Sequence, residues 1–382
     1  MEVYLDNSAT TRPSDAVVAA MSAAMTQIWH NPSALYRPAM AAEKLVAAAR
    51  KDCLNAAGAA GHRLIFTSGG TEADNLAIFG HLRRQKKPGL VLILSVEHPA
   101  VLACAAEIER LGHQVALLPV ESDGVLSLTA LEEQLDERVN LICVMQVNNE
   151  SGAVQPLEEV VRLRNAKAPG AAIHVDGVQG FLRVPIDLKY VDLYTLSSHK
   201  IHGPKGEGAL VYRKGLRFAP RQIGGGQENG LRSGTENTPG IAGLMAAVQE
   251  MLNMGPQMQN ELMQKKLHLI EAFQNAVPEL LINGPEPEQA APHIVNLSFP
   301  GVRGEVMLHA LESKGVYAST GSACSSKKLK VSGVLTAMGI SPSRAEWALR
   351  FSLSPHTTIE EIDYAAQCLA EFYAQLKKYA RR

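Results

Sequence analysis

A strand, a glycine turn and the start of a helix follow one another in Phe66-Thr67-Ser68-Gly69-Gly70-Thr71-Glu72-Ala73-Asp74-Asn75. Short apolar runs continue to alternate with helical patterns, such as those at 99–111 and 157–167, from about residue 60 to residue 215. The strand candidates are 63–67, 90–95, 115–120, 141–147, 171–175, 193–197 and 208–213. Most of them are almost continuously apolar, as strands are when helices cover both faces of a parallel sheet. The pattern predicts an α/β fold with a large, doubly wound, mostly parallel sheet of seven strands.

Helical patterns flank this region on both sides. Two Ala-rich segments precede it, one that begins at the cap candidates Ser14 and Asp15 and one over 39–57. The elements expected after it are helices at 238–253, 259–277, 304–314 and 358–380 and strands near 293–299 and 346–353. We therefore expect a large domain over 13–255 and a smaller α+β domain formed by 1–12 and 256–382.

Composition excludes several classes of protein. Of the 382 residues, 46% are hydrophobic and 20% charged, which is enough apolar surface for a folded core. The 37 basic and 38 acidic residues give a net charge of -1, so we expect a small substrate and no nucleic-acid partner. The sequence contains no apolar run of about 20 residues and its N-terminus is acidic, which favours a cytoplasmic protein without membrane contact. Five widely spaced cysteines without a C-x-x-C pair predict neither a disulfide framework nor a zinc ribbon.

The glycine turn at Gly69-Gly70 is a candidate anion site. Backbone amides at the start of a helix bind phosphate, and glycines allow the anion to approach closely. The segment has neither G-K-[ST] nor G-x-G-x-x-G, so the common nucleotide loops do not apply. The alternative is that Gly70 and Thr71 serve only to begin the helix.

Two later segments carry further candidates after predicted strands. His174-Val175-Asp176, with Gln179, places an acid where the carboxyl end of a strand faces a ligand crevice, although Asp176 is equally suited to cap a helix. Ser197-Ser198-His199-Lys200-Ile201-His202-Gly203-Pro204-Lys205-Gly206 places a lysine that forms a Schiff base if its pKa is lowered. A phosphate turn, an acid for a ring nitrogen and a lysine for an aldehyde together indicate pyridoxal 5'-phosphate, PLP. A metal pair at His199 and His202 is the alternative, but no nearby acid or cysteine completes it, so we expect no metal.

The chain also resembles, nearly from end to end, the cysteine desulfurases of the NifS/IscS type, which are PLP enzymes of fold type I, the aspartate aminotransferase-like fold. The matching stretches are Tyr4-Leu5-Asp6-Asn7-Ser8-Ala9-Thr10-Thr11, Asn31-Pro32-Ser33, Ser68-Gly69-Gly70-Thr71-Glu72-Ala73-Asp74-Asn75, Glu97-His98, Asn148-Asn149-Glu150, His174-Val175-Asp176, Ser197-Ser198-His199-Lys200, Gly224-Gly225-Gly226-Gln227-Glu228, Arg232-Ser233-Gly234-Thr235-Glu236-Asn237, Gly321-Ser322-Ala323-Cys324 and Leu349-Arg350-Phe351-Ser352.

The resemblance implies a role for each matching residue. Lys200 would hold PLP and move protons, Asp176 would pair with the ring nitrogen, His98 would stack on the ring and Gln179 would reach its phenolic oxygen. The phosphate would be bound by Gly70, Thr71, Ser197 and His199, and by Thr235 from the other subunit of a homodimer. Arg350 would bind the carboxylate of L-cysteine with a bidentate grip, assisted by Asn149 and Asn31.

Cys324 differs from the other cysteines. Cys53, Cys104, Cys143 and Cys368 lie in helical or strand patterns that predict buried thiols, whereas small polar residues surround Cys324 and predict a mobile loop. Lys327, Lys328 and Lys330 favour its thiolate. The resemblance implies that this thiolate takes sulfur from L-cysteine as a persulfide, with alanine as product. The sulfur would then pass to an acceptor protein in iron–sulfur cluster assembly or in thio-cofactor or tRNA thiolation.

Other readings stay open. The chain departs from the resemblance at Ala34 and Pro38, which concerns the entry loop rather than the chemistry. A selenocysteine lyase or an aminotransferase would share most of the ring-binding residues. A sulfur-relay protein without turnover and a metallohydrolase based on His199 and His202 are the remaining alternatives.

Overall fold

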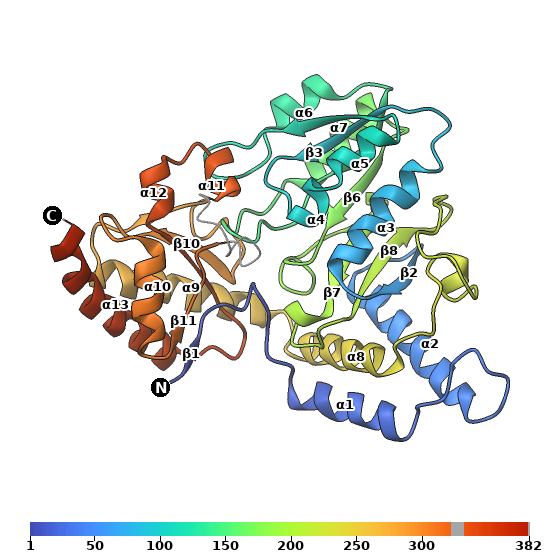
Figure 1. Cartoon of the computed structure of the whole chain (residues 1–382), viewed down its shortest axis with the longest axis horizontal. Helices are drawn as coiled ribbons and strands as arrows, with labels where there is room; N and C mark the ends of the chain where they lie inside the picture. The colour runs from blue at the N-terminus through green and yellow to red at the C-terminus, as the bar shows by residue number, and fades with distance from the viewer. Residues whose placement is uncertain (322–331, 381–382) are drawn as a thin grey trace.

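The structure is a computed structural model that describes residues 1–321 and 332–380. Its centre is a seven-stranded sheet in the order β2-β8-β7-β6-β5-β3-β4 (Figure 1). The strands are β2 (His62–Thr67), β3 (Leu90–Leu94), β4 (Gln114–Leu118), β5 (Val139–Cys143), β6 (Ala172–Asp176), β7 (Leu193–Ser197) and β8 (Gly208–Arg213). Only β8 runs antiparallel to its neighbours within this sheet, so the predicted α/β fold with a mostly parallel sheet is confirmed.

Helices cover both faces of this sheet. Successive residues of a strand point to opposite faces; Ile65 joins the core beneath α3, whereas Leu64 and Phe66 join the core that includes α8. Both faces being buried explains why the strands are almost continuously apolar. The helices of this part are α1 (Asp15–Thr26), α2 (Ala39–Ala56), α3 (Gly70–Leu82), α4 (Pro99–Leu102), α5 (Ala105–Arg110), α6 (Leu128–Gln134), α7 (Leu157–Lys167) and α8 (Thr238–Asn253), with short 3-10 helices η1 (Leu188–Tyr190), η2 (Ser198–Lys200) and η3 (Glu228–Gly230).

The helical pattern at 99–111 forms two short helices, α4 and α5, and not one continuous helix. The thiol of Cys104 donates a hydrogen bond to the carbonyl of Ala100 at 3.1 Å. That carbonyl is the acceptor that the Cys104 amide would use in a continuous helix, and the amide instead bonds to the Val101 carbonyl, three residues back. The α-helical hydrogen bonding is thus interrupted between Leu102 and Ala105.

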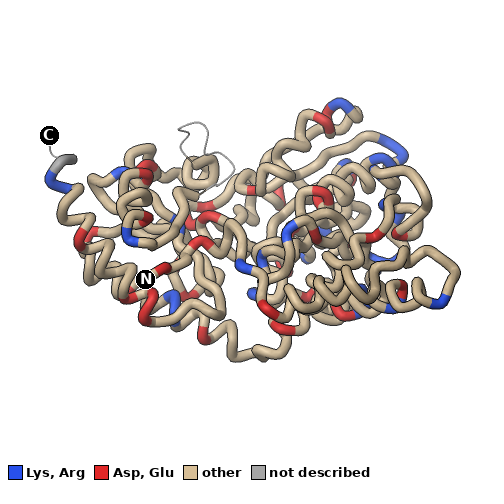
Figure 2. The backbone as a smooth tube through the Cα atoms, turned by 60° about the horizontal axis from the view of Figure 1, so that its bottom comes forward, with Lys and Arg blue, Asp and Glu red and all other residues tan. Residues whose placement is uncertain are grey.

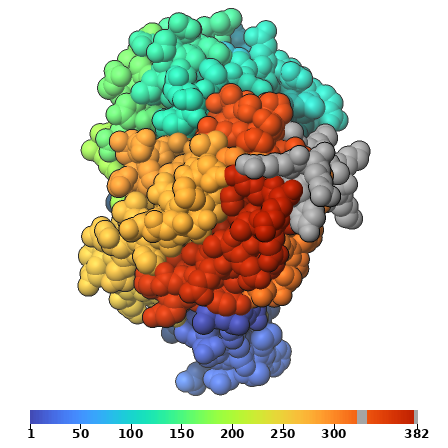
Figure 3. All heavy atoms as spheres, turned by 90° about the vertical axis from the view of Figure 1, so that its left-hand side faces the viewer, coloured from blue at the N-terminus to red at the C-terminus, as the bar shows by residue number. Residues whose placement is uncertain are grey.

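A second group of elements lies beside the large sheet (Figure 1). It comprises the antiparallel strands β9 (Leu281–Ile282), β10 (Ile294–Ser298) and β12 (Ala348–Ser352), the parallel pair β1 (Val3–Tyr4) and β11 (Val316–Tyr317), and the helices α9 (Gln257–Ala276), α10 (Gly304–Glu312), α11 (Gly333–Ala337), α12 (Pro342–Glu346) and α13 (Ile359–Ala380). The helices α9 and α13 lie side by side on its outer side, yellow and red in Figure 3. Through β1, the N-terminal residues lie on this second group. The division into domains at residues 12 and 255 stays a prediction.

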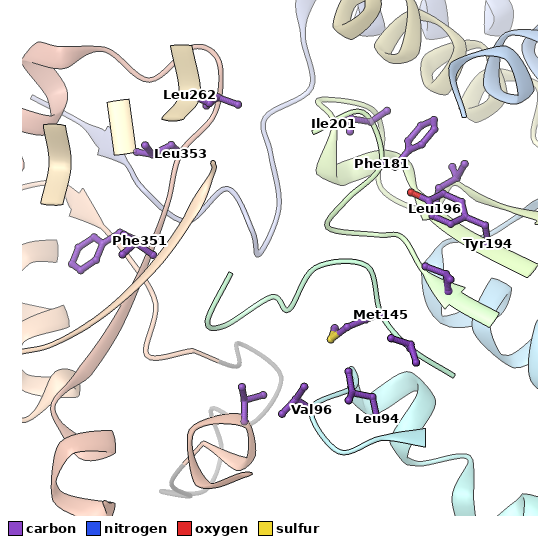
Figure 4. Packing of buried hydrophobic residues seen from close by; sticks show 14 of the residues in the cluster. Leu94, Val96, Met145, Phe181, Tyr194, Leu196, Ile201, Leu262, Phe351 and Leu353 are labelled. Atoms are coloured by element: carbon purple, nitrogen blue, oxygen red, sulfur yellow. The ribbon is translucent and has the colours of Figure 1, made fainter. Parts of the chain in front are cut away.

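One hydrophobic core joins the two groups of elements. Leu262, Phe351 and Leu353 from the second group belong to the same buried cluster as Phe181 and Tyr194 from the large sheet. Figure 4 shows these side chains on two sides of a junction through which the N-terminal segment passes. The core therefore positions the residues of both groups that face the junction.

Acidic and basic residues are interspersed over both groups of elements (Figure 2). No helix within residues 1–321 and 332–380 combines the length and the apolar character that crossing a membrane requires.

We expect Leu92→Ala on β3 to lower the free energy of unfolding by about 2–5 kcal/mol, because it leaves a cavity where the side chain was fully buried. Leu117→Ala is a matched control, since Leu117 lies on the neighbouring edge strand β4 and is 54% exposed. It should change stability by less than about 0.5 kcal/mol. Urea denaturation followed by circular dichroism measures both, and equal losses would contradict the assigned burial.

Candidate active site

A cavity of about 560 Å³ lies at the carboxyl ends of the central strands β6 and β7, against the second group of elements. It is lined from both groups and from the N-terminal segment, through Ser8 and Ala9. A smaller cavity of about 360 Å³ shares part of this wall around the start of α3. The sequence-predicted residues that line the larger cavity are Gly70, Thr71, His98, Asn149, Asp176, Gln179, Ser197, His199, Lys200 and Arg350.

Lys200 is the last residue of η2, and its partly buried side chain lines the cavity. Its Nζ donates to the main-chain carbonyls of Ser8 at 2.5 Å and Ala9 at 2.8 Å. Burial, together with the charges of Arg183 and Arg350, lowers the pKa of Lys200 to about 7, against the smaller opposing effects of two acids, Asp6 and Asp176. A large share of this amine is therefore unprotonated and nucleophilic near neutral pH.

Asp176 ends β6 with its carboxyl group buried. Its Oδ1 accepts a hydrogen bond from the Val178 amide at 2.9 Å. Burial and the nearby charge of Asp74 raise the pKa of Asp176 to about 7, and within the described part of the chain no lysine or arginine forms an ion pair with it. The site is thus built to receive a cation at Asp176, which would stabilise the ionised carboxylate.

Two further acids that the sequence analysis did not assign line the same cavity. Asp74 lies one helical turn after Gly70 in α3, and burial raises its pKa to about 7. Glu97 is buried with neither carboxyl oxygen hydrogen-bonded to a described residue, and burial raises its pKa well above the ordinary value. Two features of the sequence could have indicated that these acids line the cavity. Asp74 lies on the same helix face as Gly70, and Glu97 directly precedes His98.

Behind these acids, His174 faces Thr195 and Asp74. Its Nε2 lies 3.1 Å from the Thr195 Oγ1 and 3.4 Å from the Asp74 Oδ1. Burial lowers the pKa of His174 to about 4, so its imidazole is neutral and does not supply a fixed positive charge.

His98 presents a neutral ring to the cavity. Its Nδ1 caps α4 by accepting a hydrogen bond from the Ala100 amide at 3.1 Å, which leaves the proton of the neutral ring on Nε2. Burial and the Lys200 charge lower the pKa of His98, against the opposing effect of Asp176. A flat, uncharged ring here suits stacking on another flat ring.

The start of α3 forms the candidate anion site. Gly69 has φ +144°, a conformation that favours glycine, and a Cβ atom on Gly70 would lie 2.8 Å from the Cγ2 of Val178. These two glycines leave the first amides of α3 open towards the wall formed by Ser197 and His199. Burial and the charges of Lys200 and Lys205 lower the pKa of His199 to about 3, so it meets an anion as a neutral hydrogen-bonding group.

His199 and His202 do not face a common ligand. Nδ1 of His199 contacts the Thr10 hydroxyl at 3.1 Å, and Nδ1 of His202 contacts the Arg12 carbonyl at 3.0 Å. Within the described residues, no three His, Cys, Asp or Glu side chains gather as metal ligands do.

Arg350 extends from β12 with its guanidinium buried at the cavity wall. Its Nη2 pairs with the Asp6 Oδ1 at 2.6 Å and its Nη1 donates to the Asn149 carbonyl at 2.9 Å. Asn149 thus contacts Arg350 through its main chain. The Nε of Arg350 is buried without a hydrogen-bond partner among the described residues, so the guanidinium retains capacity for a further acceptor.

Three predicted residues are not brought to this cavity by the described structure. Asn31 is exposed in the connection between α1 and α2, where its Oδ1 accepts from the Ser33 amide. Thr235 is also exposed and does not line the cavity of its own chain. Cys324 lies outside the described residues. The roles of all three stay predictions.

Comparisons with known proteins find similar sequences and structures over nearly the whole chain. The model of the family described as Aminotransferase class-V matches residues 3–365. A protein named cysteine desulfurase from Nostoc sp. (strain PCC 7120 / SAG 25.82 / UTEX 2576) is 39% identical over 378 residues, which are 98% of this chain and 94% of that protein. Cysteine desulfurase IscS from Methanosarcina thermophila is 39% identical over 98% of this chain and 93% of its own length. A solved structure entitled NifS-like protein superposes with a TM-score of 0.91 at 33% identity, over 98% of this chain and 100% of that one.

The low pKa of Lys200 predicts its reactivity. In ligand-free protein, reductive methylation of Lys200 should rise through a midpoint near pH 7, because only the unprotonated amine reacts. Peptide mass spectrometry across a pH series measures the extent. Denatured protein is the control, and its Lys200 should show a midpoint near the ordinary lysine value of about 10.4. Equal midpoints in the folded and denatured proteins would contradict the assigned environment.

Proposed function

Since the chain belongs to the aminotransferase class-V family, we propose that it acts as a PLP-dependent cysteine desulfurase, which converts L-cysteine to L-alanine and passes the sulfur atom on. The observation that carries this proposal is the meeting of Lys200, Asp176 and Arg350 at one buried cavity. The amine, the acid and the guanidinium come from different elements and suit an aldehyde, a ring cation and a carboxylate, respectively.

The residues of the cavity fit PLP. The buried carboxyl of Asp176, raised in pKa and without a basic partner among the described residues, suits a pyridinium nitrogen. The open amides at the start of α3 suit the phosphate, and the unprotonated amine of Lys200 suits the aldehyde. When bound, PLP supplies an electron sink that weakens the bonds of the substrate next to its nitrogen.

The side chains of this chain would perform the remaining tasks. We infer that Arg350 binds the substrate carboxylate. The Arg350 guanidinium already contacts Asp6, so the substrate carboxylate would either share the guanidinium with Asp6 or displace Asp6 from it. Lys200 would take a proton from the substrate α-carbon and return one to the product, since a pKa of about 7 suits both transfers near neutral pH. His98 would keep the ring plane fixed from one side.

Cys324 is the proposed sulfur acceptor. As its thiolate attacks the sulfur of L-cysteine, a sulfur–sulfur bond forms and the carbon–sulfur bond breaks, and protonation of the carbon yields alanine. The persulfide then remains on Cys324. Gly321 and Ser332, which border the segment 322–331 that carries Cys324, both line the cavity, and this supports the proposal.

The final recipient of the sulfur is proposed only as a class of acceptor protein. Several relatives are named IscS, which favours an acceptor protein in iron–sulfur cluster assembly over one in thio-cofactor or tRNA thiolation. We also propose a cytoplasmic location, in line with the expectation from the sequence.

We also propose a homodimer in which Thr235 of each subunit completes the phosphate site of the other. Thr235 is exposed and lies away from its own cavity, as a residue that serves a second copy would. The surface also exposes large apolar side chains, including Trp29 at 65%, Leu35 at 101% and Ile223 at 87%. Apolar side chains that are exposed in one subunit are commonly covered in a dimer.

The first test removes the proposed sulfur acceptor. Cys324→Ala should keep the visible absorption of bound PLP and its change on adding L-cysteine, yet produce neither alanine nor sulfide above background in the presence of dithiothreitol. Cys368→Ala, which alters a buried thiol in α13, is the matched control and should retain turnover. Sulfide release by Cys324→Ala at the wild-type rate would refute the assigned nucleophile.

The second test asks which subunit supplies Thr235. Lys200→Ala and Thr235→Ala should each impair desulfurase activity alone. When equal amounts are unfolded and refolded together, each mixed dimer should contain one intact site, because one subunit supplies Lys200 and its partner supplies Thr235. Activity should recover to about a quarter of wild type, since about half of the dimers are mixed and each has one working site. Absence of recovery, with mixed dimers demonstrated by mass spectrometry, would place Thr235 in the site of its own chain.

A further inference from the structure

We propose that Arg183 is a positioning residue of the PLP site, which fixes the orientation of the Gln179 side-chain amide and places a positive charge next to the hydrogen bonds that Gln179 and Lys200 share at the Ser8 carbonyl. The inference rests on the proposed function, because it concerns PLP held by Lys200. Arg183 matched none of the motifs in the sequence, and it lies at the end of the turn over 178–183 that follows β6.

Arg183 is buried in an unusual way. Its side chain is 3% exposed, and within the described residues no carboxylate forms an ion pair with it. Its Nη2 donates to the Val178 carbonyl at 3.1 Å and to the Gln179 Oε1 at 3.0 Å, and its Nε has no partner in that part of the chain. A buried, unpaired guanidinium is costly, so a purely structural role is a poor explanation for it.

The contact with Gln179 decides which end of that amide faces the cavity. A guanidinium can only donate hydrogen bonds, so Arg183 holds the Gln179 Oε1 and turns its Nε2 the other way. This Nε2 donates to the Ser8 carbonyl at 2.9 Å, the same carbonyl that accepts from Lys200. Gln179 can therefore offer a donor, and no acceptor, to an oxygen atom of a bound ligand.

The charge of Arg183 acts on Lys200. Among the charged groups around Lys200, Arg183 lowers the pKa of its amine the most, ahead of Arg350. The opposing acids are Asp6 on the N-terminal segment and Asp176 at the end of β6. The neutral imidazoles of His98, before α4, and His199, in η2, face the same cavity.

The groups around Arg183 itself do not cancel its charge. Tyr194 of β7 is fully buried, and burial raises the pKa of its phenol, which therefore stays neutral. His293, before β10, is also buried, and burial followed by the charges of Arg183 and Lys266 lowers its pKa well below the ordinary value. Burial lowers the pKa of Arg183 to about 9, so its guanidinium is positively charged at neutral pH. Its neutral neighbours leave that charge free to act on Lys200.

The experiment titrates the visible absorption of the PLP-loaded protein against pH, which reports protonation at the nitrogen of Lys200. Arg183→Gln removes the charge and keeps a donor for the Gln179 Oε1, and Arg183→Met removes both. Both should raise the pH midpoint by on the order of one unit, because the positive charge no longer opposes protonation. Arg183→Lys keeps the charge and should leave the midpoint near wild type.

A second readout separates orientation from charge. Arg183→Met should weaken PLP binding about tenfold relative to Arg183→Gln, because only the former frees the Gln179 amide to turn. The matched control is Arg164→Met, which removes another buried arginine, bound to Asp192 and the carbonyls of Ala171 and Tyr190 away from the cavity. It should lower thermal stability without moving the midpoint.

The outcomes separate this inference from the proposed function. An unchanged midpoint in Arg183→Gln or Arg183→Met, in protein that absorbs as wild type does, would overturn the role of Arg183 and leave the desulfurase proposal intact. A wild-type protein that acquires no visible absorption with PLP would instead overturn the proposed function itself.

Discussion

Hydrogen bonds from the N-terminal segment hold the site together. The carbonyls of Ser8 and Ala9 accept from Lys200, and the Ser8 carbonyl also accepts from Gln179. On its other side the segment reaches the second group of elements, where Asp6 pairs with Arg350 and the Ser8 amide donates to the Ser352 hydroxyl. Lys200 and Arg350, 150 residues apart in the chain, are thereby held at one cavity by a segment that belongs to neither of their elements.

The second feature of the site is that it holds several acids and bases in one cavity. Asp74, Glu97, Asp176, Lys200 and Arg350 all line it. Burial raises the pKa of all three acids and lowers that of Lys200, and the pKa values of Asp74, Asp176 and Lys200 come to about 7, so these three groups gain or lose protons near neutral pH. Such a cavity suits a ligand that is itself cationic at one end and anionic at the other, as PLP is. The same shifts make Lys200 able to move protons.

Long helices and strands could be predicted from the sequence, whereas short ones could not. The strands of the large sheet were predictable because both faces are buried, and helices such as α7 and α8 were found at their observed bounds because their apolar spacing is regular. The two-residue strands β1, β9 and β11 and the five-residue helices α11 and α12 are too short to show a period. The break at Cys104 is a local change in main-chain hydrogen bonding and has no periodic signal.

The amino-acid sequence by itself determined the fold class and most of the residues that line the cavity, because buried strands and strand-end motifs are local patterns in the chain. Tertiary structure alone decided which groups act on one another. Asp74, Glu97 and Arg183 gain their importance from being buried beside Asp176 and Lys200. Ser8 and Ala9 take part through main-chain groups, which have no residue-specific signal. Charge interactions depend on distance and burial, and both are properties of the folded chain.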